Sequence, residues 1–140
     1  MRNKLVVFSV GAVLLLLSLG GSTYAHHGIT AFFDASRSVT MKGNVTSFEW
    51  TNPHSYIYFE VKDGKGAVEK WTGELGSVGM LSRSGWRRDT FKPGDAITAI
   101  GNPAKDGKSM MIVDKVVLAS GQELLGRNPV PVEGVTPPKE

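Results

Sequence analysis

The amino-acid sequence predicts a small all-β fold, an OB-fold-like five-stranded Greek-key barrel with one short helix between strands 3 and 4. Three observations carry this prediction. After residue 38, five segments show the alternating apolar pattern or the β-branched and aromatic composition of strands. Turn-forming residues separate these segments. The one helical pattern lies between the third and the fourth segment, as the helix does in an OB-fold barrel. A small β-sandwich of similar strand count is the alternative.

The first expected strand covers residues 39–50 (VTMKGNVTSFEW), where apolar residues alternate with polar ones. Gly43 interrupts the alternation, which predicts a bulge or a sharp bend. A long, bent first strand suits a barrel, because this strand must serve two sides of the closure. A turn signal at residues 51–53 leads into residues 54–61 (HSYIYFEV), whose β-branched and aromatic composition predicts the second strand.

The later elements follow in the order expected for the barrel. Ser77 is the expected N-cap of the helix, and Gly85 is expected to end it. The expected ranges are 63–66 for a hairpin turn, 67–75 for the third strand, 77–84 for the helix, 96–101 and 109–119 for the last main strands, and 124–125 for an extension of the sheet. The barrel domain is thus expected over residues 39–125, after an N-terminal segment 26–38. Residues 126–140 hold four of the seven prolines and are expected to form a flexible tail.

Residues 1–25 have the three zones of a secretory signal peptide. Arg2 and Lys4 precede an uncharged apolar run at residues 5–19, and small residues surround Thr23 and Ala25 at the expected cleavage site. The run is shorter than the roughly 20 residues that span a bilayer. We therefore expect cleavage after Ala25 and a location in the periplasm, with no membrane attachment of the processed chain. An uncleaved N-terminal anchor is the alternative.

Composition excludes several classes of function. The chain has 140 residues, enough for one domain, and no cysteine, which rules out disulfides, thiolate metal sites, a thiol nucleophile and a lipidated N-terminal cysteine. Two of its 16 basic residues lie in the expected leader, and without them the formal net charge falls from +3 to +1. A nearly neutral domain is not expected to bind nucleic acid.

The three histidines suggest a metal site. Cleavage after Ala25 makes His26 the N-terminal residue, directly followed by His27. An α-amine and the imidazole of the same residue form a chelate, and nitrogen donors suit Cu(II) first and also Zn(II). His54 follows the turn before the second strand, beside a loop that lines the usual OB-fold binding face. The expected copper ligands are therefore His26, His27 and His54. The alternative is that the paired histidines are solvated and His54 only contacts backbone carbonyls.

An aromatic set suggests a second kind of site. Tyr56 and Tyr58 share one face of their strand with His54, and Trp71 on the neighbouring strand is expected to join this stripe. Such a stripe stacks on sugar rings or peptide side chains. Trp86 and Arg88 are added as ligand-binding residues, because an arginine beside an aromatic ring grips anions. The alternatives are that the rings fill the core and that Trp86 pins a loop.

No catalytic pattern is present, since the chain has neither a G-x-S-x-G elbow nor a phosphate-binding glycine loop. We therefore expect a non-enzymatic periplasmic binding or accessory module that binds copper, with an unknown periplasmic protein or a small ligand as its partner. A glycan- or peptide-recognition barrel with an exposed aromatic face is the alternative function.

Several short motifs stand out together along the chain. They are His26-His27-Gly28, Phe33-Asp34, Gly43-x-Val45, Trp50-Thr51-Asn52-Pro53-His54, Glu74-Leu75-Gly76, Gly85-Trp86-x-Arg88-Asp89 and Lys92-Pro93-Gly94-Asp95. With these motifs the chain resembles a family of small exported bacterial proteins that is classed as a domain of unknown function. The likeness covers roughly residues 25–124 and implies an OB-fold barrel behind a signal peptide, but no catalytic residue. Gly28 stands where a serine often follows the paired histidines.

Overall fold

A computed structural model describes the backbone of residues 27–127 and the side chains from Ile29 onward. The expected leader, His26 and residues 128–140 of the expected tail lie outside these residues. The chain divides into two units after Phe32. Helix α2 (His27–Phe32), which the sequence analysis did not anticipate, belongs to the first unit, and all the strands belong to the second. No helix among the described residues has the length and apolar character needed to cross a bilayer.

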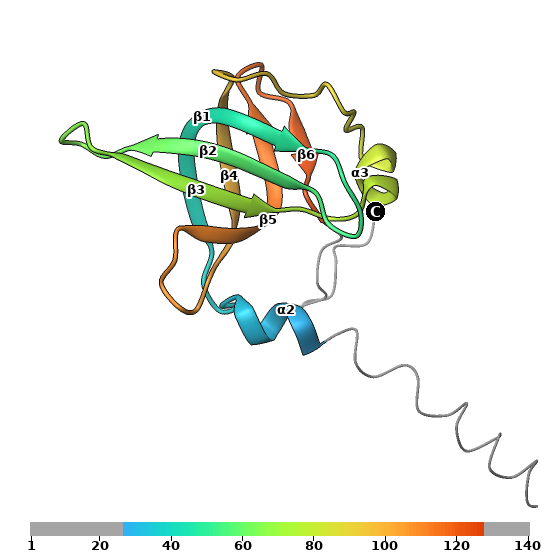
Figure 1. The fold of residues 1–140 in the computed structure, drawn as a ribbon, viewed down its shortest axis with the longest axis horizontal. Helices are drawn as coiled ribbons and strands as arrows, with labels where there is room; N and C mark the ends of the chain where they lie inside the picture. Colours follow the sequence, from blue (N-terminus) through green and yellow to red (C-terminus); the bar gives the residue numbers. More distant parts are fainter. Residues whose placement is uncertain (1–26, 128–140) are drawn as a thin grey trace, which may run out of the picture. The chain divides into compact units, whose positions relative to one another are not determined.

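The second unit is the predicted five-stranded barrel with one extra strand (Figure 1). Antiparallel pairing joins β2 to β1 and β3, and β4 to β1 and β5. A short parallel pairing of β3 with β5 closes the ring in the order β1-β2-β3-β5-β4. The sixth strand adds to the side of β5. The strands are β1 (Val39–Glu49), β2 (Tyr56–Lys62), β3 (Val68–Glu74), β4 (Ala96–Pro103), β5 (Met110–Leu118) and β6 (Glu123–Leu125).

Strand β1 serves two sides of the barrel, as its length predicted. Its first half pairs with β4 and its second half with β2, and Asn44 takes part in both ladders. Gly43 lies at this change of partner, where a Cβ atom would overlap the backbone carbonyl of Glu60 on β2. The bulge itself lies between Val45 and Ser47. Gly43 therefore permits the close approach of two backbones at the bend, and the bulge follows two residues later.

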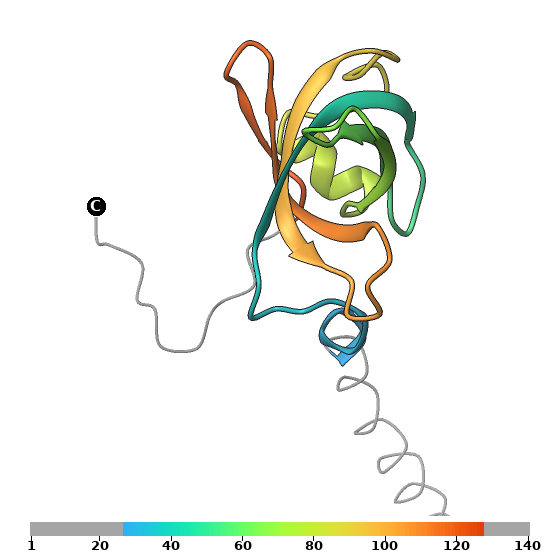
Figure 2. The ribbon, with the colours of Figure 1, turned by 90° about the vertical axis from the view of Figure 1, so that its left-hand side faces the viewer.

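The barrel interior is filled by the inward-facing residues of every main strand. Helix α3 (Val78–Arg83) covers one open end of the barrel, and Figure 2 shows it behind the ring of strands. It buries Met80 and Leu81 against the core. At this end Phe48, Trp86 and Phe91 form a ring cluster with centroid separations of 5.4 to 5.9 Å. The short helix therefore closes the core as well as linking β3 to β4.

The boundaries of α3 agree with the capping prediction. The Ser77 side chain accepts a hydrogen bond from the backbone N–H of Met80 at 3.4 Å, as an N-cap residue does. At the other end Gly85 has φ of +88°, a left-handed conformation that favours glycine. The next residue, Trp86, turns into the core. The Gly-Trp motif therefore ends helix α3 and buries the Trp86 ring at one end of the barrel core.

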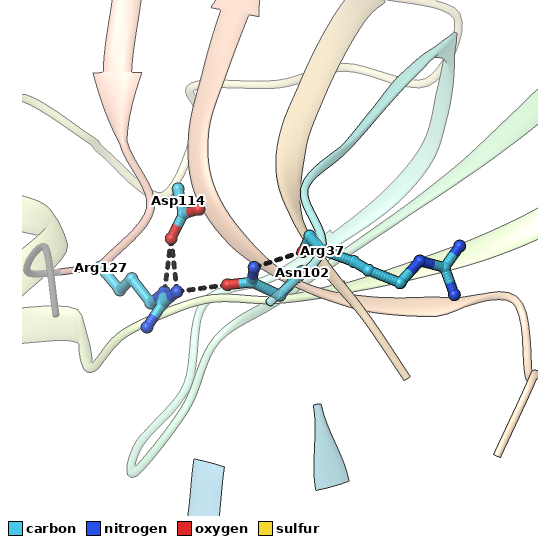
Figure 3. A network of polar contacts seen from close by, with 4 residues as sticks. All are labelled: Arg37, Asn102, Asp114 and Arg127. Carbon is cyan, nitrogen blue, oxygen red and sulfur yellow. Dashed lines mark hydrogen bonds and ion pairs between the residues drawn. The ribbon is translucent and has the colours of Figure 1, made fainter. Parts of the chain in front are cut away.

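The chain after β6 is held more firmly than the sequence predicted. Gly126, assigned to the flexible tail, donates to the Asp114 carbonyl and accepts from the backbone of Gly76, both at 2.7 Å. The guanidinium of Arg127 contacts the Asp114 carboxylate and donates to Oδ1 of Asn102 at 2.7 Å. Figure 3 shows how Asn102 continues the network to the Arg37 carbonyl. These two residues thus belong to the barrel.

Candidate functional site

Residues 51–55, between β1 and β2, form a loop that several hydrogen bonds hold in place. Ser55 is fully buried, and its hydroxyl donates to the Thr51 carbonyl at 3.1 Å. The backbone of Ser55 also pairs with Gly76 and Leu75 beyond the end of β3. The Asn52–Pro53 peptide bond is cis. This loop presents His54 from a fixed backbone.

A second anchor joins the same loop to helix α3. Oδ1 of Asn52 accepts a hydrogen bond from the backbone N–H of Val78, the first residue of the helix, at 3.0 Å. The N–H groups of the first helical turn have no partner inside the helix, so a side-chain oxygen that accepts from one stabilises both segments. The Asn-Pro-His motif therefore links the loop, the helix and the barrel end, and His54 is oriented by its neighbours.

The imidazole of His54 contacts a carboxylate across the loop. Its Nδ1 lies 2.6 Å from Oε1 of Glu74, the last residue of β3. A proton must lie between these atoms, because a bare ring nitrogen and a carboxylate oxygen would repel at this distance. The side chain of Glu74 is 14% exposed and that of His54 is 48% exposed. The contact occupies Nδ1 and leaves Nε2, the other ring nitrogen, for a ligand.

This arrangement is typical of histidines that bind metals. A metal-binding histidine usually donates its second ring N–H to a carboxylate or carbonyl, which fixes the tautomer and makes the free nitrogen a better donor. Among the described residues, no group of three or more His, Cys, Asp or Glu side chains is placed to hold a metal ion. His54 and Glu74 therefore supply one ligand and its support, and a metal site needs further donors.

Further donors were predicted at the N-terminus. His26 lies outside the described residues, and His27 is described only as the first residue of α2, without its side chain. The predicted joint site of His26, His27 and His54 therefore stays a prediction.

The outer surface of β1, β2 and β3 carries two tyrosines, and carboxylates lie on both sides of the first of them. Tyr56 pairs with Glu49 of β1 and with Glu74 of β3. In the next row outward-facing Tyr58 pairs with Ser47 and Thr72. We call these six residues the tyrosine face. Between the tyrosines along β2, Ile57 points into the core and is fully buried, and both tyrosines are half-buried on the outside.

Burial and the nearby carboxylates both raise the pKa values of the two tyrosines. Burial raises the pKa of Tyr56, and the negative charges of Glu74 and Glu49 add to this. Burial also raises the pKa of Tyr58, together with the charge of Glu49 and a hydrogen bond to it. Both hydroxyls therefore remain protonated at neutral pH, and each is a hydrogen-bond donor on a surface of negative charge.

Two of the predicted ligand-binding residues lie in the core. Trp71 pairs with Phe59, shares its inward direction and is only 8% exposed. Trp86 is 1% exposed, and its indole N–H donates to the Leu125 carbonyl at 2.8 Å. The prediction that these rings stack on a ligand is therefore wrong, and Trp86 pins a loop, as the alternative held. Arg88 is exposed in the loop after α3, on a different element from the tyrosines.

Two residues that shape the site were not predicted as site residues. The sequence predicted only a strand position for Glu74 and only a turn for Asn52. The position of Glu74 depends on the length of the hairpin turn between β2 and β3, because this length determines which residue of β3 lies opposite Tyr56. Asn52 has a weaker signal, since an Asn that caps a helix 26 residues away leaves no local pattern.

Comparison with known proteins gives the family and nothing finer. No curated protein matches the chain. One family model matches residues 13–113, which is well over half of the chain and includes the loop of His54, strand β3 and helix α3. The resemblance found in the motifs agrees with this match. The protein belongs to the family described as a family of unknown function, DUF6152.

Proposed function

We propose that the protein is an exported, non-enzymatic accessory module of the periplasm that binds copper through His54 and the processed N-terminal residues His26 and His27. The observation that carries the proposal is the 2.6 Å contact between Nδ1 of His54 and Glu74. It leaves Nε2 of a half-exposed imidazole as a donor whose tautomer and direction are set by a carboxylate.

Copper is favoured by the types of donor that the chain offers. The proposed ligands are an α-amine and imidazoles, and the chain has no cysteine. Nitrogen donors of this kind bind Cu(II) more tightly than the other divalent first-row metals, with Zn(II) as the next candidate. The amine exists only if a signal peptidase cleaves after Ala25, so the proposal joins export to metal binding.

The chain is long enough to bring these ligands together. Phe33 forms a bridge with Ala104, directly after β4. Glu74 pairs with Ile112 of β5, which in turn pairs with β4 two residues before that bridge. Phe33 therefore lies on the order of 15 Å from Glu74 along the sheet. The stretch from the processed N-terminus to Phe33 reaches at most about 24 Å when extended, and an isolated six-residue helix such as α2 unwinds at little cost.

The test is a competitive copper titration of three forms of the protein. The first begins at His26, the second keeps residues 22–25, and the third is the processed protein with His54→Ala. Four residues are kept because an amine one or two residues before a histidine can itself chelate copper through the backbone. We expect the second and third forms to bind Cu(II) at least about tenfold more weakly. Equal affinity in all three forms would overturn the proposal, and circular dichroism checks that each form is folded.

A further inference from the structure

The tyrosine face has a charge pattern that neither the core nor the proposed metal ligands explain. The row of Tyr56 carries two carboxylates, Glu49 and Glu74, and the row of Tyr58 carries only hydroxyl side chains beside its ring. In the next row along β2, Glu60 pairs with Lys70, and these opposite charges offset each other. The surface around the two rings is therefore negative.

The carboxylates lie on both sides of a ring. Residues directly opposite each other in an antiparallel ladder have Cβ atoms about 4.5–5.5 Å apart, so Glu49 and Glu74 flank Tyr56. Glu74 is partly compensated by His54. Glu49 is exposed, takes part in no ion pair among the described residues, and its one identified contact is the hydroxyl of Tyr58. A cation placed here would meet a carboxylate without an ion-pair partner in the described part of the chain, beside two tyrosine rings.

We infer that the tyrosine face binds an extended, arginine-bearing peptide segment of a partner protein. A guanidinium stacks on an aromatic face and donates two parallel hydrogen bonds to a carboxylate, which is the combination of groups found here. The negative surface disfavours the phosphates of a nucleic acid, and a neutral glycan would leave the charge of Glu49 uncompensated. The inference is independent of the proposed copper site, because it requires neither a metal nor the N-terminal histidines.

The spacing of the rings predicts the spacing of the arginines. Tyr56 and Tyr58 are two residues apart on one strand, so they project to the same side about 6.6 Å apart. In an extended peptide, side chains two residues apart also project to one side at this spacing. The matching sequence is therefore Arg-x-Arg. Adjacent arginines would point to opposite sides, and only one of them would reach the face.

The experiment is a nuclear magnetic resonance titration of the isotope-labelled, metal-free full protein at physiological ionic strength. The probe is a capped peptide Gly-Arg-Thr-Arg-Gly, compared with the same composition carrying adjacent arginines and with the lysine analogue. We expect shifts confined to residues 47–49, 56–58 and 72–74, and an affinity about fivefold or more above either comparison peptide. Glu49→Gln should weaken binding by a similar factor, and Glu123→Gln on the edge strand β6 should not change it.

Three results would overturn the inference. Equal weakening by Glu49→Gln and Glu123→Gln would reduce the binding to general charge attraction. Equal affinity for all three peptides would remove the role of ring spacing. Shifts on the tyrosine face with a chito-oligosaccharide, and none with the peptide, would assign the surface to a glycan instead. Because both substitutions replace an exposed carboxylate with its neutral isostere, the fold is expected to survive, and circular dichroism checks this.

Discussion

Nδ1 of His54 lies 2.6 Å from Oε1 of Glu74, which joins the loop after β1 to the end of β3. Glu74 is the more buried of the two, so it acts as the fixed partner of a more exposed imidazole. A single ion pair near the protein surface contributes little to folding stability. Its more important effect is that Glu74 orients the imidazole of His54. The imidazole belongs to a loop whose backbone is held by a buried serine and by the first turn of α3.

Replacing the carboxylate tests this orientation directly. Glu74→Gln keeps the shape of the side chain and removes its charge, so the free nitrogen of His54 becomes a weaker donor. We expect copper affinity to fall by about tenfold, within the range typical of such supporting carboxylates. Glu60→Gln, on the same sheet surface but in a row without His54, is the matched control and should bind as the wild type does. Unchanged affinity in Glu74→Gln would show that the carboxylate does not support the imidazole.

Removing the Asn52 side chain should loosen the loop from α3. Asn52→Ala takes away the oxygen that accepts from Val78 N–H, and the loss of such a helix-capping acceptor costs about 1 kcal/mol of unfolding free energy. Asn52→Asp keeps an acceptor oxygen and should retain most of this stability. Denaturant unfolding of the two variants measures the difference. Equal stability of Asn52→Ala and the wild type would show that the hydrogen bond does not hold the loop.

The bend of β1 should not tolerate a side chain. In Gly43→Ala the new methyl group would overlap the Glu60 carbonyl, which is backbone and cannot move aside cheaply. We expect a loss of about 2 kcal/mol or more in unfolding free energy. Gly64→Ala is the control, because a Cβ at that hairpin residue meets no atom within 4 Å. Similar stabilities of the two variants, measured by thermal unfolding, would contradict the close approach of β1 and β2.

Removing the charge of Glu49 should make the tyrosines more acidic. Its charge and its hydrogen bond to Tyr58 add to burial in raising the pKa of that hydroxyl. Glu49→Gln should therefore lower the pKa of Tyr58 toward its ordinary value and that of Tyr56 by a smaller amount. Alkaline absorbance titration reports these two groups alone once the leader, which contains Tyr24, is removed. An unchanged or higher pKa would contradict the proximity of Glu49.

The raised pKa values of Tyr56 and Tyr58 also predict how the folding stability changes at alkaline pH. Because the folded-state pKa of each tyrosine lies above its unfolded value, the folded state holds its protons longer as pH rises. The free energy of unfolding should therefore fall as pH rises through the ordinary tyrosine range and toward the folded pKa. In Glu49→Gln this part of the decline should be smaller.

The barrel could be predicted because its signals are local. Strand composition, turn residues and the N-cap Ser77 each act within a few residues, and together they specify the order of elements. Register could not be predicted in the same way. A turn over residues 63–66 would place Trp71 opposite Tyr58 on the outer surface. The register is instead shifted by one residue, because the Asp63 N–H donates to the Ala67 carbonyl, and Trp71 therefore pairs with Phe59 in the core.

The candidate site was predicted only in part for a related reason. His54 and the two tyrosines were visible from the residue types and from the alternation along one strand. Glu74 acquires its role only when β3 is placed beside β2, just as Arg127, outside the site, meets Asp114 only when the segment after β6 returns to β5. Such long-range contacts depend on the closed barrel rather than on neighbouring residues, so a single sequence gives little sign of them.

Pulsed electron paramagnetic resonance of the copper-loaded, processed protein tests the central claim most directly. The remote nitrogen of a copper-bound imidazole produces a characteristic modulation of the echo, so the imidazoles around Cu(II) can be counted. The wild-type protein should show one more bound imidazole than the His54→Ala variant, with one copper per chain. Identical modulation in the two proteins would contradict it, because the ring beside Glu74 would then not be a copper ligand.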